Sequence, residues 1–131
     1  MGTVTHPRGR ARKDFYAWLD PGIRRYVLIL REGGIETFES CQGGRNHAFG
    51  EPTVRFHGGN GEGFKALSIA ATYRLPVLQL NRYYQIEDGW PAGPEWEIVF
   101  RGPCHDVRKF KEIREFFASP RSGYTRRRID A

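Results

Sequence analysis

Glycine and proline divide this chain of 131 residues into short segments, and that division limits the folds open to it. The longest apolar run, Tyr26–Leu30, is far shorter than the roughly 18 residues that a membrane-spanning helix needs. A chain of this length has room for one domain, which can bury an ordinary core without disulfides or metal. We therefore predict one soluble domain that makes no contact with a membrane.

Side-chain periodicity predicts two kinds of element within these segments. Helical spacing predicts helices over residues 20–33, between Asp106 and Pro120, and over residues 64–74, the last with Phe64, Leu67 and Ala71 on one face. Alternating side chains predict strands over residues 35–41, 53–57, 77–87 and 96–101, with a turn over residues 88–94. The order αββαββα predicts an α+β fold with a four-stranded, mainly antiparallel sheet and helices packed on one face.

The net charge of +6 is concentrated at the two ends of the chain. Residues 1–13 carry +4 and residues 119–131 carry +3, whereas residues 14–118 sum to −1. We therefore predict a single domain over residues 14–118 between two basic, flexible tails. Basic tails can bind phosphate groups, as in proteins that bind nucleic acids, but solvated chain ends have the same composition.

Two cysteines, Cys41 and Cys104, are too few for a disulfide scaffold, so we expect a reducing, cytoplasmic location. A structural zinc site could combine Cys41, His47 or His57 with Cys104 and His105. The paired cysteine and histidine spacings of zinc-binding motifs are absent, and adjacent side chains in an extended segment point apart. We therefore predict neither a metal nor a cofactor.

The glycine-rich turn Gly58–Gly63 lies between a predicted strand and a predicted helix. Free N–H groups at a helix N-terminus can hold an anion, and glycine lets a phosphate approach the backbone closely. Arg55 and Lys65 would add positive charge, whereas Glu62 would repel a phosphate. The parallel βαβ context of a dinucleotide-binding fold is absent, so a simple connector is the alternative interpretation.

Cys41 and His47 are candidates for a nucleophile and its base, since a thiol needs a basic or cationic neighbour to become a thiolate. A half-buried cysteine near a surface histidine is the alternative. Other candidates have similarly plain alternatives. Acidic side chains could act as general acids and bases or simply be solvated; these are Glu36, Glu39 and Glu51. Aromatic side chains could stack on bases, bind a partner chain or fill the core; these are Tyr83, Tyr84, Trp90 and Trp96.

The segment G-I-E-T-F-E-S-C-Q-G-G from Gly34 to Gly44, followed by His47 and by E-P-T-V-R-F-H-G from Glu51 to Gly58, is distinctive. It resembles a family of small proteins from bacterial and phage or prophage genomes, over roughly residues 15–101. That family has no established activity, and a phage setting implies an accessory or host-counteracting role. The element Ser40-Cys41-Gln42-Gly43 is similar to the S-C-x-G element of tRNA wybutosine-synthesis methyltransferases, which implies S-adenosylmethionine and tRNA.

Three functions follow as hypotheses. The first is a non-enzymatic protein that binds a nucleotide or nucleic acid through seven residues: Arg45, His47, Arg55, His57, Gly59, Gly61 and Lys65. It requires the loops at 41–47 and 57–65 to meet in one pocket. The second is an enzyme with Cys41 as nucleophile and His47 as base. The third is a protein-interaction module that binds a partner, such as a host protein, through an exposed sheet face or edge; a homodimer is also compatible with the sequence.

Overall fold

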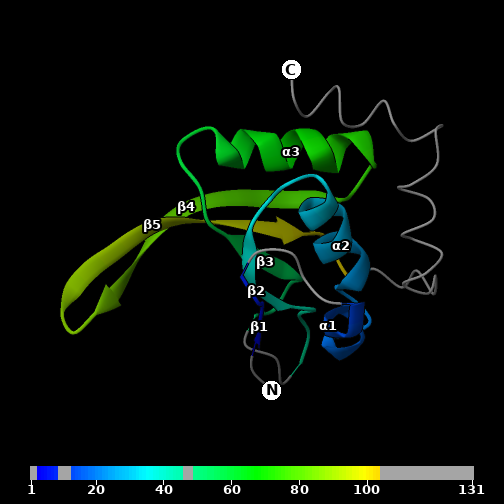
Figure 1. The fold of residues 1–131 in the computed structure, drawn as a ribbon, viewed down its shortest axis with the longest axis horizontal. Helices are drawn as coiled ribbons and strands as arrows, with labels where there is room; N and C mark the ends of the chain where they lie inside the picture. The colour runs from blue at the N-terminus through cyan, green and yellow to red at the C-terminus, as the bar shows by residue number, and fades with distance from the viewer. Residues whose placement is uncertain (1–2, 9–12, 46–48, 104–131) are drawn as a thin grey trace.

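The structure is a computed structural model that describes residues 3–8, 13–45 and 49–103 (Figure 1). Within these ranges the chain forms three helices and five strands. In chain order they are β1 (Val4–Thr5), α1 (Lys13–Trp18), α2 (Arg24–Glu32), β2 (Thr37–Cys41), β3 (Thr53–Phe56), α3 (Glu62–Thr72), β4 (Val77–Glu87) and β5 (Trp90–Phe100).

The five strands form one sheet in the order β1-β2-β3-β5-β4, and every neighbouring pair is antiparallel. This confirms the predicted α+β class with an antiparallel sheet. The predicted count of four strands is wrong by one, because β1 comes from a segment that we assigned to the N-terminal tail. The helix predicted between Asp106 and Pro120 lies outside the described residues.

A buried histidine holds the N-terminal segment to the sheet. His6 follows β1, and its Nδ1 and Nε2 atoms lie 2.6 Å from Thr37 Oγ1 and 2.9 Å from Ser40 Oγ. Its backbone N–H also donates to the Phe38 carbonyl at 2.7 Å. Burial, and secondarily the positive charge of Arg31, lower the pKa of His6 to about 3. Residues 4–6 are thus part of the folded domain, in contrast to the tail predicted over residues 1–13.

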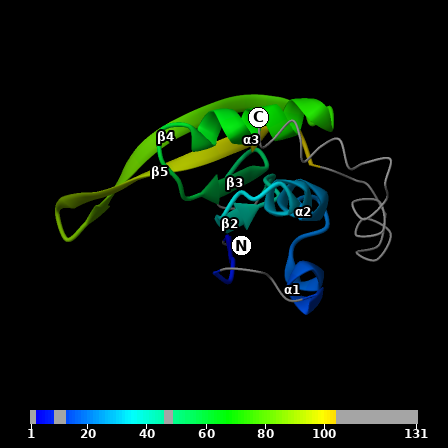
Figure 2. The same cartoon turned by 45° about the horizontal axis from the view of Figure 1, so that its top comes forward.

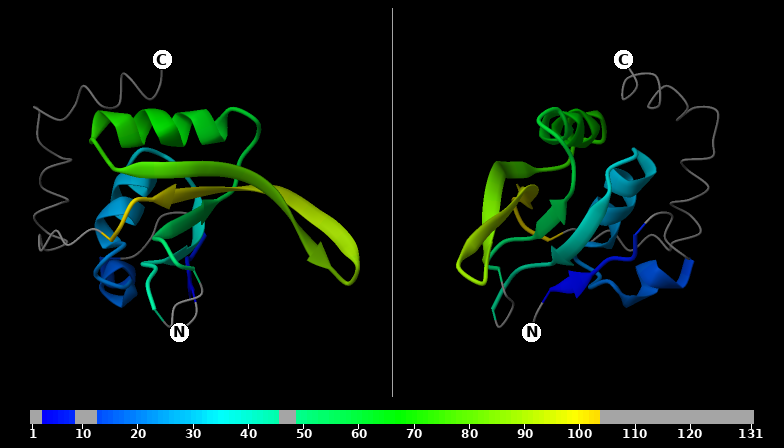
Figure 3. Two further views of the ribbon diagram at one scale, coloured as in Figure 1. Left: turned by 180° about the vertical axis from the view of Figure 1, so that it is seen from behind. Right: turned by 60° about the vertical axis from the view of Figure 1, so that its left-hand side comes forward.

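Helices α2 and α3 lie on the same face of the sheet and enclose the core with it (Figure 3). Helix α2 buries the continuous run Tyr26–Leu30. It begins at Arg24, four residues after the predicted cap at Asp20, whose carbonyl accepts a turn hydrogen bond from Ile23. The sheet contributes alternate residues of β3 and β5 to the same core, namely Val54, Phe56, Trp96, Ile98 and Phe100.

Strands β4 and β5 continue beyond the rest of the sheet as a projecting hairpin (Figures 1 and 2). Strand β3 pairs with β5 only from Trp96 to Val99, so the part of β5 before Trp96 pairs with β4 alone. We call residues 84–94 the arm. A two-residue turn, Asp88-Gly89, closes it with positive φ at both positions, which is typical of hairpins. The turn predicted over residues 88–94 is therefore wrong, because β5 already begins at Trp90.

Candidate functional site

The loops that were expected to form one pocket lie at opposite ends of a hairpin. Strands β2 and β3 are antiparallel, and Cys41 pairs with Thr53 at one end. The backbone N–H of His57 bonds to the Glu36 carbonyl at the other end. Four residues of strand, about 13 Å, separate Thr53 from His57. The predicted pocket is therefore wrong: the exposed Arg45 belongs to one end, and His57, Gly59, Gly61 and Lys65 belong to the other.

The proposed nucleophile has no access to solvent. Cys41 is fully buried, and its Sγ accepts a hydrogen bond from the Gly43 N–H at 3.4 Å. A substrate cannot reach this thiol in the described conformation. His47, the proposed base, and the potential zinc ligands Cys104 and His105 lie outside the described residues.

Two of the glycines around the start of α3 serve packing. A side chain on Gly63 would collide with the Trp96 ring, because a Cβ there would lie 2.5 Å from the ring. Gly58 has φ +143 and lies against the Glu62 side chain, so it also requires glycine. Trp96 Nε1 donates to the Gly59 carbonyl at 2.8 Å, and Arg82 donates to the Gly58 carbonyl at 2.9 Å. This turn therefore connects α3 to the base of the arm.

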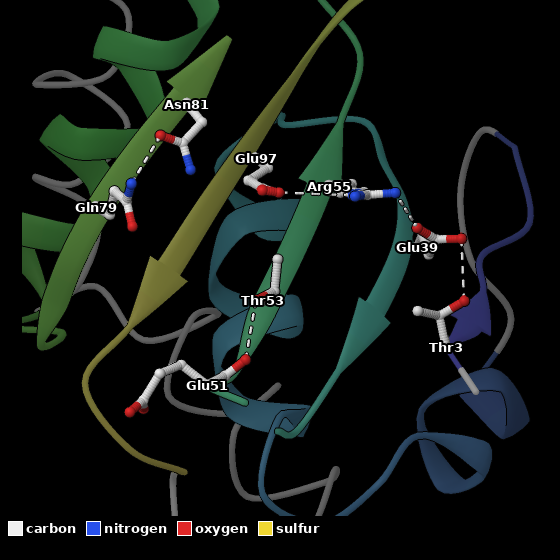
Figure 4. A network of polar contacts seen from close by, with 8 residues as sticks. All are labelled: Thr3, Glu39, Glu51, Thr53, Arg55, Gln79, Asn81 and Glu97. Carbon is white, nitrogen blue, oxygen red and sulfur yellow. Dashed lines mark hydrogen bonds and ion pairs between the residues drawn. The ribbon is translucent and has the colours of Figure 1, made fainter. Parts of the chain in front are cut away.

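Arg55 lies at the centre of a polar row on the sheet face opposite to α2 and α3 (Figure 4). Its guanidinium bonds to Glu39 on β2 at 3.0 Å and lies 3.7 Å from Glu97 on β5. Antiparallel pairing places both carboxylates directly beside it. The same guanidinium lies between the rings of Phe49 and Tyr83, at 4.8 and 4.7 Å. Internal partners thus already satisfy most of the charge that Arg55 would offer a phosphate.

His57 is engaged in a similar way. Its Nδ1 lies 2.7 Å from a Glu95 carboxylate oxygen, and its ring stacks on Phe38 at 4.3 Å. Beside it, the buried Tyr83 hydroxyl has no hydrogen-bond partner among the described residues. Burial is the main cause that raises the pKa of Tyr83 to about 12, so the phenol is neutral. This face carries more carboxylates than cations, together with neutral rings, which is an unfavourable environment for a phosphate.

The arm differs from this polar face, because its large side chains are apolar and exposed. It carries three of the large apolar side chains that are most exposed in the described chain: Tyr84 at 61%, Ile86 at 68% and Trp90 at 76%. Its charged residues are Glu87 and Asp88, with no lysine or arginine between residues 84 and 94. Solvent-exposed apolar groups on a projecting element contribute little to the fold, and such patches mark interaction sites.

Sequence reasoning missed most of the groups that define these surfaces. Glu95 and Glu97 were not singled out, although alternation along β5 places both on the polar face with Arg55. Tyr84 and Trp90 were named as aromatic candidates, but Ile86 was not. The Asp88-Gly89 pair was the available signal, since this dipeptide closes tight hairpins and leaves its flanking residues in strands.

Comparisons with protein-family models, curated proteins and solved structures give no significant match. Within the described ranges, no helix is long and apolar enough to cross a membrane. Over the same part of the chain, no group of three or more His, Cys, Asp or Glu side chains is arranged to hold a metal ion.

Proposed function

We propose that this protein is a non-enzymatic protein-binding module and that the arm is its binding element. The observation that supports this function is the exposure of Tyr84, Ile86 and Trp90 on a hairpin that leaves the sheet. Fully burying one such side chain contributes about 1.5–3 kcal/mol, and aromatic residues are enriched among the residues that dominate binding energy. Because Trp90 pairs with Glu87, its ring lies on the opposite face of the hairpin from Tyr84 and Ile86, and a partner that covers either face gains an apolar contact.

The charge of the arm favours a protein partner over a nucleic acid. Phosphate backbones attract lysine and arginine, and proteins that bind single strands combine aromatic rings with a basic groove. The arm instead carries two carboxylates, Glu87 and Asp88, beside Trp90. Such a surface fits an apolar protein surface with basic groups at its rim.

The base of the arm is well supported, which limits the entropy lost on binding. The Arg82 guanidinium lies 4.6 Å from the centroid of the Trp96 ring. The Trp96 ring in turn packs on Gly63 of α3. A binding element held on a rigid base loses less conformational freedom than a mobile loop, so more of its contact energy contributes to affinity.

Site-specific photo-crosslinking tests this function. A photoreactive residue, p-benzoylphenylalanine, replaces Trp90 in one variant and Trp18 in a matched control, since Trp18 is equally exposed but lies outside the arm. Irradiation in the native cells is expected to give a discrete protein adduct from position 90 and none from position 18. The adduct mass then distinguishes a second copy of the 15.1 kDa chain from a different protein. Equal adduct patterns at the two positions, or no adduct at position 90, would contradict the proposal.

Binding of a phosphate-bearing ligand and Cys41-dependent catalysis stay predictions. Both relied on one pocket between the two loops, and the described geometry separates those loops. A role in counteracting a host protein is one form of the protein-binding function proposed here.

A further inference from the structure

Strand β4 forms a long edge of the sheet. It runs for 11 residues, and in the described part of the chain it pairs with β5 alone. Proteins commonly protect such edges with lysine, proline or very short strands. Strand β4 contains neither lysine nor proline, and its single arginine, Arg82, bonds to groups of its own chain.

The outward-facing backbone groups of β4 follow from its pairing. The Tyr83 carbonyl lies on the β5 side, since a Cβ on Gly93 would lie 3.3 Å from it. Backbone groups alternate in direction along an antiparallel strand, so those of Leu80 and Arg82 face away from β5. The extra residue of the bulge near Tyr83 is on β5, because Tyr83 pairs with Glu95 and Gln85 with Ala92. Alternation on β4 therefore continues from Gln79 to Glu87, and Tyr84 and Ile86 also face outward; the second irregularity, between Val77 and Gln79, places its extra residue on β4.

The sequence of β4 has similar residues at two pairs of positions around Arg82, namely Gln79 with Gln85 and Leu78 with Ile86. Two copies paired antiparallel around that residue place Leu78 opposite Ile86, Gln79 opposite Gln85 and Leu80 opposite Tyr84. The outward-facing backbone N–H and C=O groups of Leu80, Arg82 and Tyr84 in one copy then lie opposite those of Tyr84, Arg82 and Leu80 in the other. The exposed apolar side chains Leu78, Tyr84 and Ile86 all gain an apolar neighbour.

Charges at the two ends of β4 are also complementary in this arrangement. The tip of each arm, with Glu87 and Asp88, reaches the partner's chain near Val77 and Pro76. Arg74 and Arg101 are exposed there, and the Arg101 N–H bonds to the Pro76 carbonyl at 2.6 Å. Each acidic tip therefore meets a basic pair on the other copy, which favours this antiparallel orientation.

We propose that the chain forms a symmetric dimer in which two β4 strands pair antiparallel about Arg82 and extend the sheet across both copies. This proposal rests on the arm as the binding element and names a second copy of the chain as its partner. The two edges are identical, so the contact is closed, and the two Arg82 side chains opposite each other at its centre each stay bonded to the Gly58 carbonyl of their own chain.

Sedimentation equilibrium with charge-swap variants tests the dimer and its register. The wild-type chain is expected to show twice the 15.1 kDa chain mass. Leu78→Glu or Ile86→Lys alone buries an unpaired charge and weakens the dimer about tenfold or more. Leu78→Glu combined with Ile86→Lys places opposite charges in contact and restores the dimer. A monomeric wild type, single variants that dimerise normally, or a double variant without recovery would each overturn the proposal.

Amide hydrogen exchange of the wild type provides a second test that needs no substitution. The Leu80 and Arg82 amides face solvent in a single copy and become protected in the dimer. Their protection is therefore expected to rise with protein concentration, whereas fast exchange of both at concentrations where the mass has doubled would overturn the proposal. A monomeric chain whose Trp90 position still crosslinks to a different protein would overturn the dimer and leave the protein-binding function intact.

Discussion

The two edges of the sheet are built in opposite ways. Strand β1 has two residues, and the buried His6 beside it bonds to two hydroxyl groups of β2. Strand β4 has 11 residues, and its outer half carries exposed apolar side chains. One edge is short and held by polar contacts, and the other is long and available for pairing. This difference indicates that the exposure of β4 is a property of that edge and not of a generally open sheet.

The largest expected effect concerns the support of the β4 edge. Trp96→Ala removes the ring that packs on Gly63 and donates to Gly59, so we expect a loss of about 3–5 kcal/mol in the free energy of unfolding. Urea unfolding measures it. Trp18→Ala is the control, because that ring is exposed. A loss below about 1 kcal/mol for Trp96→Ala would show that the base of the arm is independent of α3.

The β1 edge should weaken in acid. The unfolded chain protonates His6 near pH 6.5, whereas the folded chain, with its pKa of about 3, does not. The unfolded state therefore binds more protons between these values, and stability falls as the pH drops through this window. We expect His6 to account for about 2.5 kcal/mol of lost stability between pH 7 and 4.5.

Urea unfolding at both pH values, on the wild type and on His6→Gln, isolates this contribution. The variant is expected to have a smaller pH dependence, because glutamine does not titrate. Equal pH dependence in the two chains would mean that His6 is already protonated or accessible in the folded state.

We expect a smaller loss of stability when the polar row around Arg55, which joins the interior strands, is disrupted. Arg55→Met keeps a long side chain between Phe49 and Tyr83 but leaves Glu39 and Glu97 without their shared cation. Because these groups are partly exposed, we expect a loss of about 1–2 kcal/mol. Arg8→Met is the matched control, since Arg8 pairs with Glu36 at an exposed site. Thermal unfolding measures both variants. Equal losses of melting temperature in Arg55→Met and Arg8→Met would show that the polar row does not stabilise the fold.

The smallest expected effect on stability is at the arm. Trp90→Ser is expected to change the free energy of unfolding by no more than about 0.5 kcal/mol, because the ring is mostly exposed. The same substitution should strongly reduce binding of the partner protein, measured by crosslinking from Ile86. A large loss of stability would instead indicate that Trp90 packs within its own chain.

Alternation of side chains was sufficient to predict the fold class and most strands, including the bounds of β4. It failed at β5, because Pro91, Gly93 and Pro94 are typical of turns. These residues lie where β5 has no neighbour on its β3 side, so missing N–H groups cost little there. Strand β1 escaped prediction since a two-residue strand has no periodicity to detect.

The buried face of α3 also differs from the predicted one. Phe64, Leu67 and Ala71 suggested an apolar stripe, but the structure buries Gly63, Ala66, Ile69 and Ala70. Small residues let the helix approach the sheet closely enough for the Trp96 ring to lie against Gly63. In the candidate site, Arg55 was correctly located on β3, whereas His57 was predicted as the last residue of that strand and lies just beyond it. Their carboxylate partners depend on strand register, which the sequence does not specify.

The unequal exposure of the three tryptophans makes the chain its own optical reporter. Trp96 is buried, whereas Trp18 and Trp90 face solvent. A Trp18→Phe chain would keep one emitter in the interior and one at the hairpin tip. Unfolding would move the emission of Trp96 to longer wavelengths, and covering of Trp90 by another chain would move its emission to shorter ones. The two events therefore have opposite spectral signs in one unlabelled protein.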